Sequence, residues 1–263
     1  MQYNVVIIGG SSGFGGEITK LISNDNKFSL FVCGKHSINS NKIKFLKLNL
    51  VNFKSIKHCI FELKKKINTI DILILNSSCF FLKKKIIQYK YERSFLLNYF
   101  AQFYIINLLK RKIIKSKLKK IIVISSHTIF NSNINYKDIQ SLGFYNFWKS
   151  YKNAKKLMLL YCLKNFKENK KISYIFFNPG RIKTGLGTNI PILGLIIKFY
   201  HLIFGNHPKN VAKDFFYILK KYIQKNGFFY YFNRKKKKTF NMKKYINDYK
   251  KIEIYNEKFF TKL

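Results

Sequence analysis

Five of the chain's 13 glycines fall within positions 9–16, directly after an apolar run near the N-terminus. The string VVIIGGSSGFGGE gives a GxxxGxG spacing between a strand candidate and a helix candidate. Glycines permit a tight turn, a close backbone approach to phosphate and close helix–strand packing, and the helix that follows directs N–H donors at an anion. The pattern therefore predicts a dinucleotide diphosphate site at Gly9, Ser11, Ser12, Gly13, Phe14 and Gly15.

The rest of the chain alternates short apolar runs with longer amphipathic stretches. Continuous β-branched or aromatic runs are typical of parallel strands buried on both faces. The strand candidates are Asn4–Ile8, Ser29–Cys33, Lys44–Leu48, Ile70–Leu75, Lys120–Ser125 and Ile172–Phe177. The helix candidates are Glu17–Ser23, Ser55–Lys66, Tyr91–Lys110 and Tyr151–Phe166. This alternation predicts an α/β Rossmann-like domain over residues 1–263, with a doubly wound parallel sheet in three layers.

The chain carries 51 Lys and Arg against 11 Asp and Glu, for a net charge of +40. Such a balance is a common footprint of nucleic-acid binding. Arginine, the favoured base reader, is nevertheless scarce, whereas Lys, Asn, Ile, Phe and Tyr, which have AT-rich codons, are abundant. We interpret the charge as codon bias and expect no specific nucleic-acid partner. A basic nucleic-acid or membrane-surface protein stays an alternative function.

The four cysteines form no CxxC pair, and no Cys/His cluster has metal-ligand spacing, so we predict no metal site. Scattered thiols suit a reducing compartment. The first strand candidate leaves no room for a signal peptide, and no apolar run reaches the roughly 18 residues that span a bilayer. We therefore expect a cytoplasmic protein. Gly185–Gly205 is largely apolar and is either a substrate lid (about 185–206), an interfacial membrane helix or a core helix.

The residues after the second strand candidate favour one nicotinamide cofactor over the other. NAD enzymes usually carry an acidic residue there, which binds the ribose hydroxyls. Here the sequence reads FVCGKH, so Lys35 and His36 stand in its place. A cation suits a 2′-phosphate, which favours NADPH over NADH.

Further motifs follow in the order found in the short-chain dehydrogenase/reductase family, which the chain resembles. Ile8–Gly15 matches the family's TGxxxGxG loop with Ile8 for Thr, and Asn49–Leu50 matches its adenine-pocket motif with Asn for Asp. The NNAG motif is reduced to Leu75-Asn76-Ser77-Ser78, in which Asn76 survives. Asn98 matches the helix asparagine and Ser126 the strand-end serine. The PGxxxT motif runs from Pro179 to Thr184 and adds the cofactor-binding residues Pro179, Gly180, Ile182 and Thr184.

The family's acid–base tyrosine must be chosen among four Tyr-x-x-x-Lys pairs. Those at Tyr217 and Tyr231 follow the PGxxxT motif, which is the wrong order. Between Tyr145/Lys149 and Tyr151/Lys155, helical periodicity decides. Lys155 is followed at helical spacing by the apolar residues Met158, Tyr161 and Cys162, whereas the equivalent face after Lys149 would bury three lysines, and burying unpaired charge is costly. We therefore assign the pair to Tyr151 and Lys155.

The resemblance implies hydride transfer with Tyr151, Lys155, Ser126 and Asn98 as catalytic residues. An ammonium at Lys155 is expected to favour the phenolate of Tyr151, Ser126 to hydrogen-bond the substrate oxygen, and Asn98 to support a water relay to Lys155. The stretch 135–158 and the C-terminal tail, about 241–263 and expected to be helical, resemble the retinol dehydrogenase and light-dependent protochlorophyllide reductase branch. That branch implies a bulky apolar substrate, reduced at a carbonyl or a ring C=C. Peripheral membrane contact and a homo-oligomer are further expectations, and a non-catalytic NADPH-binding module stays the alternative.

Overall fold

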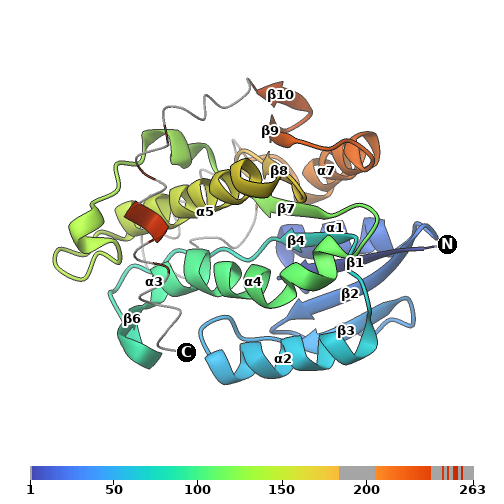
Figure 1. Ribbon diagram of the computed structural model, residues 1–263, viewed down its shortest axis with the longest axis horizontal. Coiled ribbons are helices and arrows are strands. Elements are labelled where there is room, and N and C mark those ends of the chain that lie inside the picture. Colours follow the sequence, from blue (N-terminus) through green and yellow to red (C-terminus); the bar gives the residue numbers. More distant parts are fainter. Residues whose placement is uncertain are drawn as a thin grey trace.

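The computed structural model describes residues 2–183 and 205–237, together with residues 245, 248, 251–253 and 256 of the tail. In this part of the chain one eight-stranded sheet has the order β10-β9-β8-β7-β4-β1-β2-β3, with helices on both faces (Figure 1). Each neighbouring pair runs parallel except β10 against β9. The predicted doubly wound parallel sheet is therefore confirmed.

The strands begin and end close to the predicted positions. The central ones are fully buried, which explains their continuous apolar sequences. Their bounds are β1 (Tyr3–Ile8), β2 (Phe28–Gly34), β3 (Ile43–Lys47), β4 (Ile72–Leu75), β7 (Lys120–Ile124), β8 (Ser173–Asn178), β9 (Phe228–Phe232) and β10 (Lys235–Lys237). A separate hairpin pairs β5 (Ile86–Ile87) with β6 (Tyr91–Glu92). The carboxyl ends of β1, β4 and β7 meet at one edge of the sheet, where ligands bind in open α/β folds.

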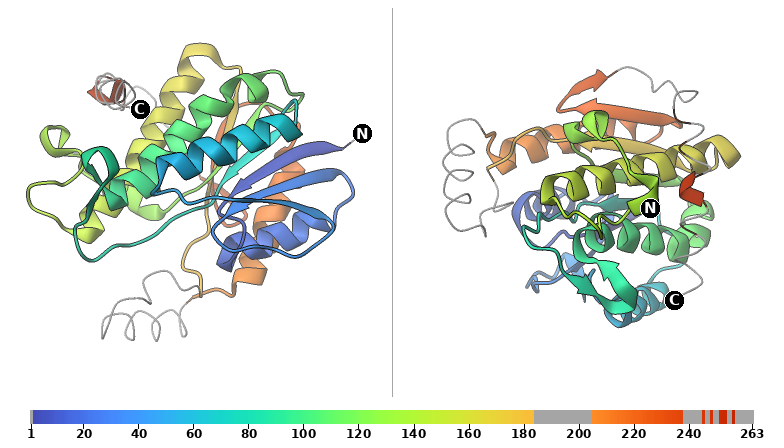
Figure 2. Two further views of the ribbon diagram at one scale, coloured as in Figure 1. Left: turned by 90° about the horizontal axis from the view of Figure 1, so that it is seen from below. Right: turned by 90° about the vertical axis from the view of Figure 1, so that its left-hand side faces the viewer.

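Two helical layers cover the sheet (Figure 2). One face carries α1 (Gly13–Ser23) and α7 (Pro208–Tyr222), which pack together on the sheet. Their core joins side chains of the sheet such as Val5 to helix side chains such as Phe215. The other face carries α2 (Phe53–Lys66), α4 (Ala101–Ile114) and α5 (Phe147–Asn169), packed over side chains such as Val6 and Leu160. Alternate residues of β1 thus point into two separate cores, as a sheet buried on both faces requires.

Two parts of the fold differ from the sequence prediction, and a third prediction falls on residues that the structure does not describe. The stretch expected as one helix from Tyr91 to Lys110 starts as β6, continues as the short α3 (Arg93–Phe95) and one π-helical turn (Leu96–Phe100), and only then becomes α4. The lysine run Arg234–Lys238, whose charge alone predicts a solvated loop, contains β10, which pairs with the aromatic β9. The substrate lid expected at about 185–206 lies outside the described residues, except for Gly205 and Asn206.

The described residues of the tail contact the helical layer formed by α4 and α5. Ile252 is buried in the same core as α5, and Glu253 forms an ion pair with Lys164 of that helix. The side chain of Asn256 accepts a 2.7 Å hydrogen bond from Tyr99 in the π-helical turn. These residues therefore pack against the outer side of the helical layer.

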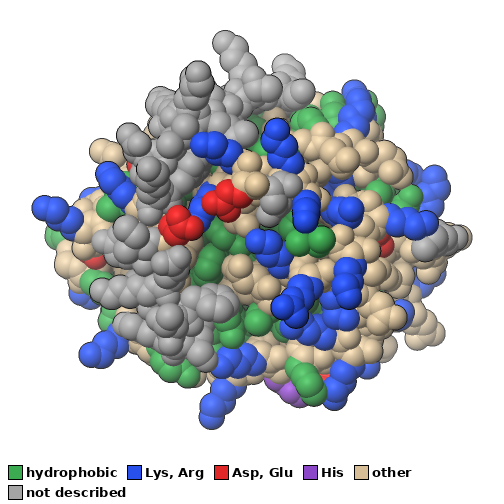
Figure 3. Space-filling model, viewed as in Figure 1, with side chains coloured by type: hydrophobic (Ala, Val, Ile, Leu, Met, Phe, Trp, Pro, Cys, Tyr) green, Lys and Arg blue, Asp and Glu red, His purple; other side chains and the backbone are tan. Residues whose placement is uncertain are grey.

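None of the helices within the described ranges combines the length and apolar character that crossing a bilayer demands. On the visible face, Lys and Arg side chains are scattered rather than gathered into one stripe (Figure 3).

Candidate active site

The glycine loop is a tight cradle between β1 and α1. Gly9 has φ +84, a conformation that side chains rarely adopt, and a Cβ there would overlap Ser77. A Cβ on Gly15 would overlap the carbonyl oxygen of Gly9 and the amide of Asn76. That amide donates a 2.7 Å hydrogen bond from Nδ2 to the Gly9 carbonyl oxygen. Gly9 and Gly15 are therefore required for α1 to start this close to β1 and β4.

The N-terminus of α1 presents donors at the mouth of this cradle. Ser12 occupies the N-cap position, but its side chain does not cap the helix, and the first turn carries no acidic residue. Gly13 has φ +54 with open space where a Cβ would stand. Further along, Thr19 Oγ1 donates to the carbonyl oxygen of Gly10 at 2.8 Å and ties the helix to the loop. The start of α1 therefore keeps unneutralised N–H groups that face outward.

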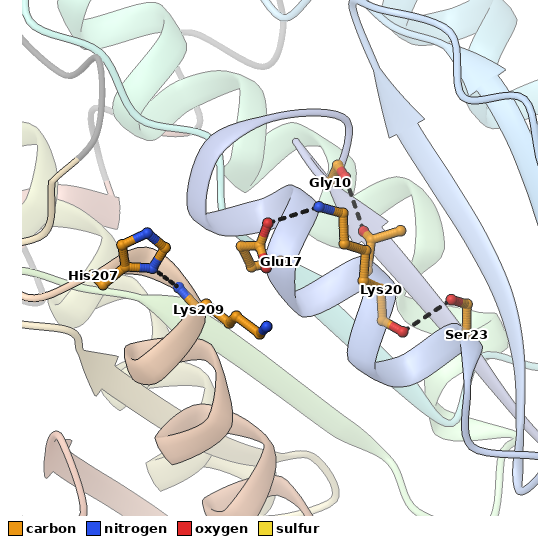
Figure 4. Close-up of polar contacts among 7 residues, drawn as sticks. Gly10, Glu17, Lys20, Ser23, His207 and Lys209 are labelled. Carbon is orange, nitrogen blue, oxygen red and sulfur yellow. Dashed lines mark hydrogen bonds and ion pairs between the residues drawn. The ribbon is translucent and has the colours of Figure 1, made fainter.

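Other polar contacts are local to the two helices of this layer (Figure 4). Lys20 turns back to pair with Glu17 on α1, and His207 Nδ1 accepts from the backbone N–H of Lys209 at the start of α7. Phe14 belongs to this packing, because its ring lies 6.2 Å from that of Phe177 in the core. Only the backbone of Phe14 is thus available to a ligand at the loop.

The three residues that follow β4 link the glycine loop to the assigned tyrosine. Asn76 binds the Gly9 carbonyl, and the backbone N–H of Ser77 donates to Ile8. Ser78 Oγ lies 3.4 Å from the phenol oxygen of Tyr151. Because three consecutive residues span no more than about 10 Å, the loop and the phenol lie at the same end of the sheet.

Tyr151 is a buried phenol in an aromatic setting. It is 5 % exposed, and its ring lies 4.1 Å from that of Phe80. Burial raises the pKa of Tyr151, while hydrogen bonds from Ser78 and Ser126 partly oppose that rise. In the chain without cofactor, desolvation outweighs these hydrogen bonds, so the lowering of this pKa by Lys155 stays a prediction. The phenol is therefore protonated at neutral pH.

Lys155 lies one helical turn beyond Tyr151 on α5. Its Nζ donates to the carbonyl oxygen of Ile124, the last residue of β7, at 3.0 Å, and it lies 5.8 Å from the Tyr151 ring centroid. Burial lowers the pKa of Lys155 to about 8. The lysine is thus held at the end of β7, beside the phenol.

Asn98 sits in the π-helical turn, a helical irregularity often found at functional sites. The residue is fully buried, and its Oδ1 accepts from the backbone N–H of Cys79 at 2.9 Å and from Ser78 Oγ at 3.2 Å. Its Nδ2 donates to the carbonyl oxygens of Cys79 and Ser94. The side chain therefore anchors the segment after β4; among the described contacts it is not bonded to Lys155.

Ser126 follows β7 and begins the short helix His127–Asn131. Its Oγ accepts from the Thr128 hydroxyl at 3.1 Å and also contacts the phenol of Tyr151. Tyr151, Lys155, Ser126 and Asn98 are thus brought together from three elements of the fold.

Glu92 and Ser150 support this group and were missed by the sequence analysis. The fully buried carboxylate of Glu92 caps α3 by accepting from the N–H groups of Ser94 and Phe95, both at 2.8 Å. It also accepts from Ser150 Oγ at 3.2 Å, directly before Tyr151. Burial raises the pKa of Glu92, and these hydrogen bonds oppose that rise. The capping pattern of Glu92 was hidden because the sequence suggested an uninterrupted helix there.

The remaining predicted cofactor residues line the same edge of the sheet. Lys35 is exposed just beyond β2, and Ser11 packs against Gly34 at the end of that strand. Asn49 is exposed and Leu50 is buried after β3, and Pro179 is buried after β8. Gly180 has φ +70, and its N–H donates to Asn178 Oδ1. Ile182 bridges to Asn206, whereas Thr184 lies outside the described residues.

The rejected pair lies apart from this arrangement. Tyr145 precedes α5, so it does not share a helical face with Lys149, and its hydroxyl donates to the carbonyl oxygen of Phe81. Lys149 is exposed, whereas Lys155 is buried.

Apolar, partly exposed side chains lie beside the phenol and in the loop before α5, and together they form an apolar rim. Trp148 stacks on Phe80 at 5.3 Å between ring centroids and is 43 % exposed. Leu142 and Phe144 are exposed in the loop before α5, and Lys84 Nζ donates to the Leu142 carbonyl oxygen, which joins that loop to the segment after β4. Large apolar side chains at a site's mouth suit an apolar ligand.

The residues of the sheet edge fit a nicotinamide dinucleotide. Gly9, Gly13 and Gly15 leave the cradle that a diphosphate needs, and the start of α1 offers uncapped donors. Lys155 and Tyr151 lie where β4 and β7 end, on the other side of the Asn76–Ser78 segment. The arrangement can hold an anionic cofactor at the loop and exchange a proton at the phenol.

Comparison with protein families gives a match over most of the chain. The family model described as short chain dehydrogenase matches residues 3–191. Retinol dehydrogenase 14 of Mus musculus is 27 % identical over 158 residues, which are 59 % of this chain and 47 % of that protein. Polyprenol dehydrogenase of Danio rerio is 23 % identical over 205 residues, 70 % of this chain and 63 % of that protein. The chain thus spans less than two thirds of the length of these relatives.

Solved structures share the fold at low sequence identity. The 3-alpha-hydroxysteroid dehydrogenase from Pseudomonas sp. B-0831, complexed with NADH, superposes with a TM-score of 0.69 at 12 % identity. The match covers 88 % of this chain and 95 % of that one.

Proposed function

Because the chain belongs to the short-chain dehydrogenase family, whose members are oxidoreductases, we propose that it transfers hydride between NADP(H) and a bulky apolar alcohol or carbonyl compound. One observation carries the proposal: the consecutive residues Asn76, Ser77 and Ser78 contact the glycine loop at one end and the phenol of Tyr151 at the other. A diphosphate bound at the loop would therefore lie at the same end of the sheet as the phenol, where the reacting carbon of a substrate would be held.

In this proposal the nicotinamide cofactor supplies or accepts the hydride. The chain's residues handle the proton and the orientation. During reduction the Tyr151 phenol donates its proton to the substrate oxygen, and its raised pKa keeps that proton available at neutral pH. Ser126 Oγ donates a hydrogen bond to the same oxygen, on which negative charge develops. Lys155 binds the nicotinamide ribose and adds positive charge beside the phenolate that forms.

The preference for NADPH rests on Lys35, which is exposed beyond the end of β2. A lysine there attracts the 2′-phosphate, whereas an acidic residue would repel it. Replacing Lys35 with Asp should therefore weaken binding of NADPH more than binding of NADH.

An apolar substrate is supported by the rim of Phe80, Leu142, Phe144 and Trp148 and by the printed names of two relatives, retinol dehydrogenase 14 and polyprenol dehydrogenase. The same rim, with exposed lysines such as Lys149 beside it, supports peripheral contact with a lipid surface from the cytoplasm. A homo-oligomer stays a proposal. Members of the family commonly pair through the helices that match α4 and α5, and the tail residues packed beside α5 cover part of that face.

The first test is fluorescence titration with NADPH and NADH, followed by a screen of retinoid, polyprenoid and steroid alcohols and their carbonyl forms. We expect tighter binding of NADPH than of NADH and turnover of at least one apolar substrate. Binding of neither nucleotide would remove the proposal.

The second test is Tyr151→Phe, which removes the proton donor and keeps the ring. Turnover should fall at least about 100-fold while NADPH affinity stays within about twofold, because acid–base catalysis alone contributes 10²–10⁴-fold. Tyr217→Phe is the matched control, since Tyr217 starts another Tyr-x-x-x-Lys pair on the exposed side of α7. Unchanged turnover in Tyr151→Phe would instead favour a non-catalytic NADPH-binding module.

A further inference from the structure

Ser78 brings an additional hydroxyl into the site. It follows β4, and its Oγ lies 3.4 Å from the phenol oxygen of Tyr151 and 3.2 Å from Asn98 Oδ1. Ser78 is half-buried, and both of these contacts are partly buried. In the sequence, Ser78 is the last residue of the reduced NNAG motif, which gives it no role.

The single hydroxyl hydrogen of Ser78 has two acceptors to choose between. While the phenol is neutral, Ser78 can donate to Asn98 Oδ1 and accept the phenol's hydrogen. Once the phenol has lost its proton, rotation about the Cβ–Oγ bond turns the same hydrogen toward the phenolate. Asn98 Oδ1 then keeps its second donor, the backbone N–H of Cys79 at 2.9 Å, so no buried acceptor is left without a partner.

We propose that Ser78 is a further catalytic residue, which donates its hydroxyl hydrogen to the Tyr151 phenolate each time the proton leaves the phenol. This rests on the proposed function, in which hydride reaches the carbonyl carbon while the phenol proton passes to the carbonyl oxygen. Ser78 gains and loses no proton in the step. The phenolate recovers its proton from solvent before the next reduction, or starts the reverse reaction as the base that accepts the alcohol proton.

The surroundings make this contribution large enough to measure. In the proposed reaction Ser126, the other hydroxyl at the phenol, donates its hydrogen to the substrate oxygen, whereas the hydrogen of Ser78 can turn to the phenolate. Two titratable groups face Tyr151 from the elements packed around it: Cys79 after β4, whose raised pKa keeps it neutral, and Lys155 on α5. A hydrogen bond to a charged oxygen in such a site corresponds to roughly tenfold or more in rate.

The main experiment measures the pH dependence of kcat/KM for alcohol oxidation in Ser78→Ala. Without the donor, the phenolate becomes less stable, so the acid limb of the profile should move up by about one pH unit. At neutral pH kcat/KM should then fall about tenfold, with NADPH affinity unchanged. Ser78→Thr keeps the hydroxyl and should restore most of the rate. Ser116→Ala is the matched control, because Ser116 is also buried and hydrogen-bonded but precedes β7 at the opposite edge.

A second measurement needs no substrate. Ultraviolet difference titration between the wild type and Tyr151→Phe reports ionisation of this one phenol among the chain's tyrosines. The same difference in the Ser78→Ala background should show a smaller ionised fraction at each alkaline pH at which the chain stays folded.

The outcomes separate the two proposals. If Tyr151→Phe abolishes turnover but Ser78→Ala matches the wild type in rate and pH profile, the role of Ser78 is overturned and the proposed function stands. If the wild type turns over no substrate, the proposed function fails. The ultraviolet titration then still tests Ser78: if Tyr151 ionises to the same extent with and without the Ser78 hydroxyl, the role of Ser78 is overturned as well.

Discussion

Two buried lysines stand at opposite ends of the central strand β7. Lys120 is its first residue, is fully buried and donates from Nζ to the carbonyl oxygen of Lys225 at 2.7 Å. Lys155 reaches the last residue, Ile124, and donates to its carbonyl oxygen at 3.0 Å. Burial lowers the pKa of both lysines to about 8. By burial, titration and hydrogen bonding the two are nearly equivalent.

Their surroundings differ, and that difference carries the functional meaning. Lys155 has Tyr151 one helical turn away and the hydroxyls of Ser78 and Ser126 around that phenol. Lys120 lies at the amino edge of the sheet, which is the edge where the parallel strands begin. Its backbone N–H donates to the carbonyl oxygen of Asp71, and its ammonium donates to the carbonyl oxygen of Lys225, which follows α7. A perturbed pKa thus marks burial, and only the neighbouring groups make it a reactive site.

The strongest way to break the comparison is to replace each lysine with methionine, which has similar length and no charge. Lys155→Met should lower kcat/KM at least about 100-fold, because the ribose contact and the charge beside the phenolate are both lost. Lys120→Met should leave kcat/KM within about twofold. Steady-state kinetics on the two variants, with circular dichroism as a check of folding, measures the contrast. Equal losses in both variants would mean that burial alone, and not the site, explains Lys155.

Two adjacent glycines of α1 offer the same kind of contrast at the glycine loop, because only one of them is closely packed. A Cβ at Gly15 would overlap Gly9 and Asn76, whereas the nearest atom to a Cβ at Gly16 is 3.9 Å away. Gly15→Ala should therefore displace the loop and raise the dissociation constant of NADPH at least about tenfold. Gly16→Ala should leave that constant unchanged and stabilise the helix by about 0.5–1 kcal/mol. Fluorescence titration and thermal unfolding distinguish the two; comparable affinities would show that the loop does not hold the diphosphate.

The sequence predicted the elements around the glycine loop better than the contacts around Tyr151. The glycine spacing and the continuous apolar strands are local signals, so β1, α1 and the central sheet could be read directly. Ser78, Glu92 and Ser150 carry no such signal, because their roles arise from contacts between β4, α3 and α5, which are distant in the chain. The helix expected from Tyr91 was wrong at its start for the same reason: the buried Glu92 cap and the β5–β6 hairpin override its apolar periodicity.

The smallest expected effect concerns stability at alkaline pH, and it tests the amino edge alone. Lys120 has a pKa of about 8 in the folded chain against 10.5 for an unperturbed lysine. Below pH 8 both states carry the proton, and the folded state bears the full cost of burying the charge. Between these two pKa values the unfolded chain binds more protons, so the free energy of unfolding should rise with pH, by at most about 1.4 kcal/mol per pH unit for this group.

Lys120→Met removes this contribution, so urea unfolding of the variant should show a shallower rise than the wild type between about pH 8 and 10. The buried tyrosines oppose stability only at higher pH and do so equally in both proteins, so their effect cancels in the difference. If the free energy of unfolding changes equally with pH in the two proteins, Lys120 keeps an ordinary pKa. Lys120 and Lys155 would then resemble each other only in being buried at the ends of β7.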